Sequence, residues 1–165
     1  MRDMIKAGLV ALVLSLSLAA PVTAGPFEDG FAAAERGDYA TAFKLWRSLA
    51  DQGYASAQYN LGFMYANGEG VKQDYAEAVT WYRKAADQGH AGAQNNLGVM
   101  YRDGQGVKQD YVQAHKWLNL AAARYPASEA ERRDKSVKNR DLVAAKMTPA
   151  QIAKAQKLAR DWKPK

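Results

Sequence analysis

The stretch that decides the fold is AQYNLGFMYANGEGVKQDYAEAVTWYRKAADQGH, residues 57–90. It occurs again 36 residues later as AQNNLGVMYRDGQGVKQDYVQAHKWLNLAAARYP, residues 93–126. A partial copy lies upstream, where DYATAFKLWRSLADQGY (38–54) matches DYAEAVTWYRKAADQGH (74–90). A repeat of this length, with small and aromatic residues at fixed places, is typical of helical-hairpin solenoids.

Each copy of the repeat predicts two helices joined by a loop. Small and apolar residues recur at helical spacing, which predicts one buried face on each helix. These residues are Ala57, Leu61, Gly62 and Tyr65 in the first helix, and Ala78, Trp81, Tyr82 and Ala85 in the second. Glycine inside a helix costs about 0.5–1 kcal/mol relative to alanine, so Gly62 predicts a close approach of a neighbouring helix. The repeated tryptophans could form a ligand platform, but at this spacing we expect them in the core.

The loop string NGEGVKQDY, residues 67–75, recurs as DGQGVKQDY at residues 103–111. Its first glycine suits a left-handed residue that ends the first helix. Asp74 stands where it can cap the second helix, and Glu77 three residues later would complete a capping box. The spacing does not match a P-loop, a dinucleotide-binding loop or a calcium loop. We therefore interpret the string as the bend of a helical hairpin and its lysines as surface residues.

These residues resemble the Sel1-like repeat (SLR) family, a branch of the tetratricopeptide-like solenoids. The family pattern reads roughly A-x-A-Q-x-x-L-G-x-x-Y-x-x-G-x-G-V-x-x-D-x-x-x-A-x-x-W-Y-x-x-A-A-x-x-G. The sequence supplies nearly all of it at residues 55–89 and again at 91–122, with Leu118 in place of the second aromatic residue. The ending MTPAQIAKAQKLARDW (147–162) resembles the closing helix of many exported members. The resemblance implies an all-α, right-handed helical-hairpin solenoid that binds other proteins or peptides.

The chain departs from the resembled family in two respects. Some secreted relatives stitch each hairpin with a disulfide, whereas this chain of 165 residues has no cysteine. It also has only two full repeats, and a solenoid needs about three units to be stable. The flanking segments must therefore act as caps. We expect an N-terminal half-repeat or cap at 25–54, repeats at 55–90 and 91–126, and C-terminal capping helices with a basic tail at 127–165.

Start signals support these capping helices. Pro26 suits the first turn of a helix. Ser128 and Glu131 predict a capping box ahead of a polar helix. Thr148 and Gln151 give a second start signal, for a last helix with an apolar face.

The N-terminus is typical of a secretory signal peptide at residues 1–24. Arg2 and Lys6 precede an apolar run, and VTA at residues 22–24 places small residues where a signal peptidase cleaves. The run is shorter than the about 20 apolar residues that a membrane span needs; an uncleaved anchor is the alternative. We expect an exported protein, periplasmic or secreted, with no integral membrane segment after cleavage.

Charge is unevenly distributed along the chain. Residues 25–128 carry 10 basic and 11 acidic residues, whereas residues 129–165 carry 11 basic and 5 acidic ones. The basic segment either contacts an anionic partner or forms a solvated helical face that keeps the protein soluble. Nucleic acid is normally inaccessible after export, so we expect no nucleic-acid partner.

An enzyme needs a convergent set of ionisable groups, and the sequence offers none. His90 and His115 are the only histidines, and neither has a repeated partner that would suggest a metal site. Some secreted members of the resembled family are associated with penicillin binding, but Ser-x-x-Lys and Lys-Thr-Gly are absent from the sequence. We therefore predict no catalytic residue, no bound metal and no cofactor.

The first helices predict a binding face. In helical-hairpin solenoids these helices usually line the concave surface. The side opposite the buried face carries Asn60, Phe63, Met64, Asn67, Asn96, Val99, Met100 and Asp103. Methionine adapts its shape to a ligand, and asparagine can hydrogen-bond a peptide backbone in both directions. Met64 and Met100 could instead pack between adjacent first helices.

The resulting hypothesis is an exported, non-enzymatic scaffold or adaptor that binds a protein or peptide along its concave face. The rival hypothesis is an envelope protein that binds or hydrolyses cell-wall or β-lactam-like compounds. The sequence lacks a visible pair of nucleophile and base, which counts against the rival.

Overall fold

The computed structural model describes residues 25–165, and the predicted signal peptide at residues 1–24 lies outside them. The described residues form eight α-helices and one short 3-10 helix, with no strand among them. The elements are α1 (Pro26–Glu35), α2 (Tyr39–Asp51), α3 (Ala55–Asn67), α4 (Tyr75–Asp87), α5 (Ala91–Asp103), α6 (Tyr111–Arg124), η1 (Ala127–Glu129), α7 (Ala130–Ala144) and α8 (Pro149–Arg160). Each helix from α1 to α7 packs against the next, apart from the short η1 between α6 and α7. The prediction of an all-α helical-hairpin solenoid is confirmed.

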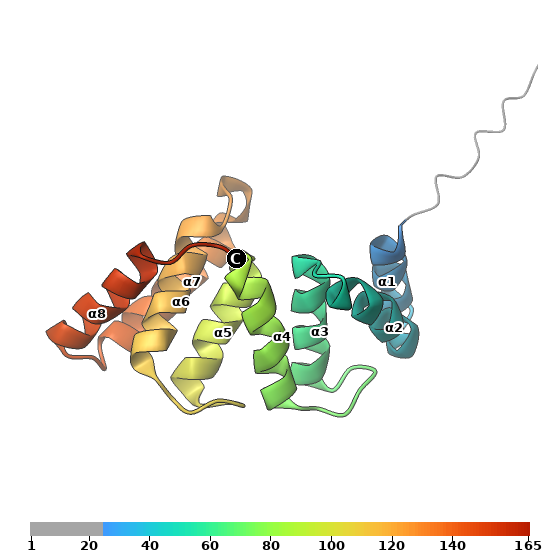
Figure 1. Ribbon diagram of the computed structural model, residues 1–165, viewed down its shortest axis with the longest axis horizontal. Helices are drawn as coiled ribbons and strands as arrows, with labels where there is room; N and C mark the ends of the chain where they lie inside the picture. The colour runs from blue at the N-terminus through green and yellow to red at the C-terminus, as the bar shows by residue number, and fades with distance from the viewer. Residues whose placement is uncertain (1–24) are drawn as a thin grey trace, which may run out of the picture.

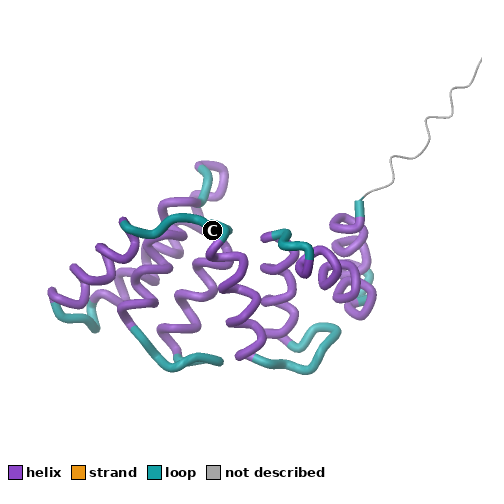
Figure 2. Tube along the Cα trace, viewed as in Figure 1, coloured by secondary structure: helices purple, strands orange, loops and turns teal. Residues whose placement is uncertain are grey.

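The helices stand side by side in a curved row, with α1 and α2 at one end and α8 at the other (Figure 1). The two repeated loops, between α3 and α4 and between α5 and α6, lie along the same edge of the row (Figure 2). This placement follows from the repeat, because equivalent loops occupy equivalent positions when the hairpins stack.

The repeated loop ends one helix and contacts the neighbouring unit. Gly104 follows α5 with a φ of 70°, which is the left-handed conformation predicted for the end of this helix. Gly106 has a φ of 66°, and a Cβ atom there would lie 2.2 Å from the backbone oxygen of Tyr75, the first residue of α4. Gly68 and Gly70 repeat both features. The second glycine of each loop is therefore a contact point between successive hairpins.

Asp74 caps α4 as predicted, since its Oδ1 accepts hydrogen bonds from the backbone N–H groups of Ala76 at 2.9 Å and Glu77 at 3.0 Å. The other half of the predicted capping box is wrong, because the backbone N–H of Asp74 already donates to the carbonyl of Tyr65 at 2.9 Å. That bond ties the end of the loop back to α3 and leaves the carboxylate of Glu77 without a backbone donor to accept.

The two predicted capping boxes near the C-terminus had different outcomes. The box at Ser128 is wrong: the chain forms η1 there, and α7 begins at Ala130 without a side-chain cap. The box at Thr148 is confirmed. Its Oγ1 accepts from the backbone N–H of Gln151 at 3.3 Å, and the side chain of Gln151 accepts from the backbone N–H of Thr148 at 2.8 Å.

The core follows the second helices. Trp46, Trp81 and Trp117 are each no more than 5% exposed, which confirms that the tryptophans are core residues. Gly62 receives the ring of Tyr82, because a Cβ at Gly62 would lie 2.6 Å from that ring. The predicted close approach at this glycine is therefore confirmed, and the approaching group is an aromatic side chain.

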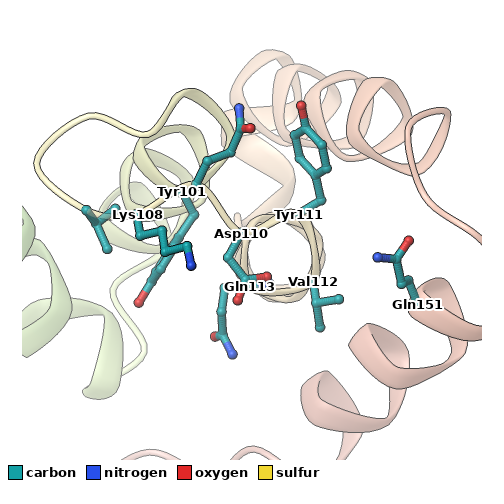
Figure 3. A pocket seen from close by; sticks show the side chains of 9 residues that line it. Tyr101, Lys108, Asp110, Tyr111, Val112, Gln113 and Gln151 are labelled. Carbon is teal, nitrogen blue, oxygen red and sulfur yellow. Dashed lines mark hydrogen bonds between the residues drawn. The ribbon is translucent and has the colours of Figure 1, made fainter.

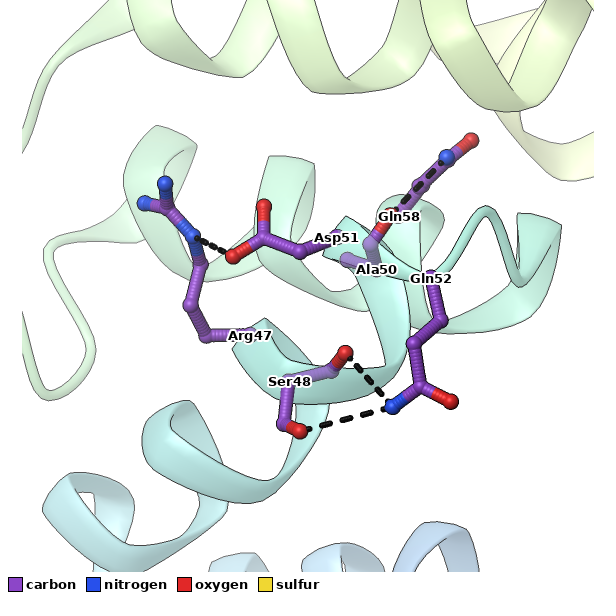
Figure 4. A network of polar contacts seen from close by, with 6 residues as sticks. All are labelled: Arg47, Ser48, Ala50, Asp51, Gln52 and Gln58. Atoms are coloured by element: carbon purple, nitrogen blue, oxygen red, sulfur yellow. Dashed lines mark hydrogen bonds and ion pairs between the residues drawn. The ribbon is translucent and has the colours of Figure 1, made fainter.

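A buried glutamine ties each first helix of the two repeats to the second helix before it. The Nε2 of Gln58 donates to the backbone carbonyl of Ala50 at 3.2 Å, at the end of α2 (Figure 4). The Nε2 of Gln94 does the same to Ala86 at 3.0 Å. Each carbonyl also accepts from a backbone N–H three residues later, that of Gly53 or Gly89, at 3.0 Å, so the glutamine supplies a second donor at the end of the helix.

The C-terminal segment covers α6. Both α7 and α8 pack on α6, and Trp162 meets Trp117 edge to face at 6.3 Å between ring centroids. The guanidinium of Arg124 lies over the ring of Trp162 at 4.2 Å. The chain then returns to α4, where the backbone N–H of Lys165 donates to the carbonyl of Asp87 at 2.9 Å. Within residues 25–165, no helix is both long enough and apolar enough to cross a membrane.

Candidate functional site

A groove runs along the first helices of the hairpins, and it is built from three adjoining hollows. The first, the α3–α5 hollow, has a volume of about 190 Å³. It brings together five of the residues predicted for the binding face: Phe63, Asn67, Asn96, Val99 and Met100. The prediction that α3 and α5 present these side chains to a common space therefore has a structural counterpart.

The second, the aromatic hollow, has a volume of about 330 Å³ and lies among α1, α3, the start of α5 and the link from α6 to α7. Its aromatic lining residues are Phe27, Phe31, Tyr59, His90 and Tyr125. Phe31 is 45% exposed, which is unusual for so large an apolar side chain. Burial raises the pKa of Tyr125 to about 12, so its hydroxyl stays protonated at neutral pH.

The third, the polar hollow, has a volume of about 170 Å³ and connects the other two. It shares Tyr59, Tyr125 and Arg132 with the aromatic hollow, and Asn96 with the α3–α5 hollow. We call the three hollows together the inner groove. Since the hollows share lining residues, a single extended ligand can contact all three.

Phe63 and Val99 are the apolar surface of the α3–α5 hollow. Phe63 is 43% exposed and Val99 is half-buried. Asn67 is exposed, and its Nδ2 donates to the carbonyl of Phe63 at 3.0 Å, which leaves its side-chain oxygen as an acceptor. These three side chains are open to a ligand.

The two methionines predicted for the binding face are buried and do not form an exposed apolar strip. Met64 is 1% exposed and Met100 is 4% exposed, and both belong to the core clusters. They pack in the interior against the second helices: Met64 belongs to the same core cluster as Trp46 and Trp81, and Met100 to that of Trp117. Met100 still forms part of the floor of the α3–α5 hollow, whereas Met64 is not among the residues that line the groove.

The two asparagines at equivalent repeat positions have different surroundings. Asn96 is half-buried; its Oδ1 accepts from Asn95 at 3.2 Å, and its side chain faces the hydroxyl of Tyr82, which lowers the pKa of that hydroxyl against the larger effect of burial. Asn60 is 8% exposed, lines the aromatic hollow, and has a buried Nδ2 without a hydrogen-bond partner among residues 25–165. Asn60 is thus a floor residue of the groove and does not project from its surface.

Asp103 lies apart from the groove. Its carboxylate forms two hydrogen bonds with the guanidinium of Arg102, at 2.7 and 2.8 Å, and these bonds lower the pKa of Asp103. Arg102 in turn donates to Asn139 of α7 at 3.0 Å. This carboxylate belongs to a structural contact between α5 and α7, and it does not line any of the three hollows.

His90 has a structural role at the start of α5. Its Nδ1 accepts a hydrogen bond from the backbone N–H of Ala93 at 3.1 Å and so caps the helix. Its ring stacks on Tyr59 at 4.6 Å between centroids. Burial lowers the pKa of His90, which favours the neutral imidazole that this cap requires. This cap was not predictable from the sequence, because histidine is not a preferred capping residue.

His115 is 4% exposed in α6, and burial also lowers its pKa. It belongs to a second helix, whereas His90 lines the aromatic hollow of the groove. Within residues 25–165, no cluster of histidine and carboxylate groups has the arrangement needed to hold a metal ion.

Another hollow borders the repeated loop of the second hairpin. It has a volume of about 690 Å³, and Figure 3 shows side chains of this loop with Gln151 of α8 around it. The Oδ1 of Asp110 accepts from the backbone N–H of Gln113 at 3.0 Å. The Nε2 of Gln109 donates to the carbonyl of Arg102 at 2.7 Å. These polar groups maintain the loop itself, so the inner groove remains the better candidate site.

The lining residues that sequence reasoning missed include Phe31, Tyr59, Tyr125 and Arg132. Phe31 and Arg132 lie in the segments predicted as caps, for which a binding role was not considered. Tyr59 was detectable, because the second repeat has Asn95 at the same position, and this difference lies beside Asn60 on the first helix.

A family model described as the Sel1 repeat matches residues 27–54, 55–90 and 91–125. No curated protein sequence matches the chain. Among solved structures, the chain is similar to c5321, a protective antigen present in uropathogenic Escherichia coli strains and displaying an SLR fold. The two share 32% identity with a TM-score of 0.74, over 83% of this chain and 29% of that one.

The chain is also similar to a Sel1 repeat protein from Oxalobacter formigenes, with 26% identity and a TM-score of 0.64. That match covers 86% of this chain and 55% of the other. The chain therefore spans less than two thirds of the length of either relative, and the likeness concerns the repeat solenoid.

Proposed function

The chain belongs to the Sel1 repeat family, and we propose that it is a non-enzymatic adaptor that binds a protein or peptide segment in the inner groove. The observation that carries this proposal is the continuity of the groove. The polar hollow shares Tyr59, Tyr125 and Arg132 with the aromatic hollow and Asn96 with the α3–α5 hollow, and the three together follow the first helices. An extended peptide fits such a surface, whereas small-molecule sites are usually single deep clefts.

The lining of the α3–α5 hollow suits a peptide. Phe63 and Val99 offer apolar contact for one side chain of a ligand. The free side-chain oxygen of Asn67 can accept a hydrogen bond from a backbone N–H of the same ligand. Aromatic contact beside polar groups that fix orientation is the usual composition of a peptide-recognition surface.

The environment of the ionisable groups supports a binding role over catalysis. His90 caps a helix, and Asp103 is paired with Arg102. The Nδ1 of His90 is used by the cap, and Asp103 lies outside the groove, so neither forms the hydrogen-bonded pair of nucleophile and base that acyl or glycosyl transfer would require.

Export is the second part of the proposal. It rests on the signal-like segment at residues 1–24, followed by repeat hairpins and a C-terminal cap at residues 127–165. The similarity to a protective antigen of uropathogenic Escherichia coli strains supports a place in the bacterial envelope or outside the cell. Whether the destination is the periplasm or the medium would follow from cell fractionation.

The basic segment at residues 129–165 contributes less free charge than its sequence suggests. Arg132, Arg133 and Arg140 each pair with a neighbouring carboxylate, at 2.9, 3.1 and 2.8 Å. Exposed pairs of this kind reduce the field of the segment. We therefore propose that any anionic partner is contacted locally, at the end of the groove that α7 borders.

The test compares capture of envelope or secreted proteins by the wild-type chain with capture by Phe63→Ser. Loss of the apolar contact should weaken binding of a groove ligand, because exposed aromatic residues are frequent hot spots. Tyr54→Ser is the matched control, since Tyr54 is 59% exposed and does not line the groove.

Partners that are lost with Phe63→Ser and kept with Tyr54→Ser support the inner groove as the binding site. Partners retained by both variants would show that the groove is not the contact. Turnover of a β-lactam or a muropeptide by the purified protein would overturn the proposal of a non-enzymatic adaptor.

A further inference from the structure

Asn60 and Asn96 occupy the same position in the two repeats, but only one of them is satisfied. The side chain of Asn96 accepts from the amide of Asn95 and faces the hydroxyl of Tyr82. The Nδ2 of Asn60 is buried and has no hydrogen-bond partner within residues 25–165. A buried donor without an acceptor is unfavourable, and in native proteins such a group often awaits a ligand or water.

The cause lies one repeat upstream of Tyr82. Trp46 stands there, 36 residues earlier, and its indole has a donor and no acceptor. That N–H already donates to the carbonyl of Phe27 at 3.1 Å. Trp46 therefore offers Asn60 no oxygen where Tyr82 presents its hydroxyl to Asn96, and the Nδ2 of Asn60 is left as an unpaired donor at the floor of the aromatic hollow.

The aromatic hollow around this amide is shaped for an apolar group. Phe31, Tyr59 and Tyr125 surround it, and Phe31 is 45% exposed. Tyr59 is held in place by its stacking on His90. The volume of about 330 Å³ accommodates one large side chain together with its backbone.

The adjoining polar hollow carries positive charge. Arg132 and Lys135 both line it. Glu129 pairs with Arg132 at 2.9 Å and lines the aromatic hollow. Two cations against one carboxylate leave a net positive charge at this end of the groove, which favours an anionic group on the ligand.

We propose that this end of the inner groove binds the C-terminal residue of a peptide. The apolar side chain of that residue occupies the aromatic hollow, its free carboxylate contacts Arg132 and Lys135, and a backbone carbonyl accepts from Asn60. The two hollows share Tyr59 and Tyr125, so the apolar and anionic groups must be close together. A terminal residue has both on one α-carbon. The inference rests on the proposed function and specifies its ligand.

Other ligands satisfy only part of this arrangement. An inorganic anion would leave the aromatic hollow unfilled. An internal peptide segment with an apolar side chain would lack the carboxylate, and the cations would gain no partner.

The test uses two probes that differ only in the terminal charge: N-acetyl-Ala-Phe with a free carboxylate, and the same dipeptide as its C-terminal amide. Binding to the purified protein is measured by calorimetry and mapped by NMR chemical-shift changes. We expect the free acid to shift the amide signals of Tyr59, Asn60 and Arg132. We expect the amide probe to bind about tenfold more weakly, because it loses a charge-assisted hydrogen bond.

Two variants examine the protein side. Asn60→Leu removes the unpaired donor, and Lys135→Gln removes one cation. Each variant should bind the free-acid probe about five- to tenfold more weakly than the wild-type protein does. Lys138→Gln is the matched control, because it removes the same charge from the same helix but lines a different hollow. If Asn60→Leu does not fold, as judged by loss of its helical circular dichroism signal, the inference is tested by comparing the affinities of Lys135→Gln and Lys138→Gln for the free-acid probe.

Equal affinity for the acid and the amide, shifts confined to Phe63 and Val99, or no binding of either probe would each overturn the inference. The partner-capture experiment tests the groove as a whole, so its outcome can be distinguished from the outcome for the terminal-residue pocket. A partner that is lost with Phe63→Ser but retained by Asn60→Leu and Lys135→Gln would leave the groove as the binding site and remove the terminal-residue pocket.

Discussion

Gly106→Ala should destabilise the protein more than its backbone angle alone predicts. Gly106 lies in the repeated loop with a φ of 66°. A Cβ atom there would lie 2.2 Å from the carbonyl oxygen of Tyr75 and 2.7 Å from the backbone nitrogen of Ala76. Both obstacles are backbone atoms at the start of α4, so no side-chain rotation can make room.

The magnitude follows from two separable costs. An L-residue in the left-handed region costs about 1–2 kcal/mol. Overpacking against a neighbour that cannot move away costs about 1–3 kcal/mol more. Gly37→Ala isolates the first cost, because Gly37 has a φ of 78° and nothing within 4 Å of the added atom. We therefore expect the free energy of unfolding to fall by about 1–2 kcal/mol for Gly37→Ala and about 2–5 kcal/mol for Gly106→Ala.

Urea unfolding followed by tryptophan fluorescence measures both variants. The dependence of the free energy on urea concentration, the m-value, reports whether the hairpins still unfold together. Because Gly106 lies between two hairpins, a lower m-value is expected for Gly106→Ala and not for Gly37→Ala. If the two variants lose the same free energy within about 0.5 kcal/mol, the contact with Tyr75 is not a close-packed junction and the reasoning fails.

Three further outcomes follow from particular contacts. Thr148→Ala should cost about 1 kcal/mol and speed hydrogen exchange in the first turn of α8, whereas Ser128→Ala, which removes no cap, should not. Gln94→Ala should cost about 1–3 kcal/mol in urea unfolding, because it removes the hydrogen bond from Gln94 to the carbonyl of Ala86 and leaves a cavity where the fully buried side chain packed. Burial lowers the folded-state pKa of His90 from 6.5, so the unfolded chain binds the proton more readily. The contribution of His90 to stability should therefore be fully present above about pH 6.5 and should decrease as the pH falls below that value. His90→Asn keeps a capping acceptor but does not titrate, so its melting temperature should depend less on pH.

The helical hairpins were predictable because their signals are local. A glycine that ends a helix or an aspartate that begins one acts within four residues, and both appear twice at the same spacing. Asp74 and Gly104 therefore behave as expected. The capping box at Asp74 failed for a non-local reason, since its N–H is taken by Tyr65, nine residues earlier.

The groove was less predictable because it depends on contacts between units. The alternation of buried and exposed positions on α3 does not reveal that Trp46 of α2 and Trp81 of α4 share a core cluster with Met64, so the burial of Met64 could not be decided from the pattern. The aromatic hollow requires Phe31 of α1 and Tyr125 beyond α6, which are far apart in the sequence. No repeat position indicates that these segments converge on Tyr59.

The differences between the two repeats nevertheless mark the groove. Helices α3 and α5 differ at five of their 13 positions. In α3 these are Ser56, Tyr59, Phe63, Ala66 and Asn67, which fall on one stripe of the helix, and every one of them lines a hollow of the inner groove. The positions that stay identical include the buried Ala57, Leu61 and Gly62, which stacking holds constant. Each hairpin must present the same surface to its neighbours, and only the stripe facing the groove is free to vary. Variation between copies therefore indicates the groove-facing side of α3 more reliably than the exposure pattern, and it does so without reference to any other protein.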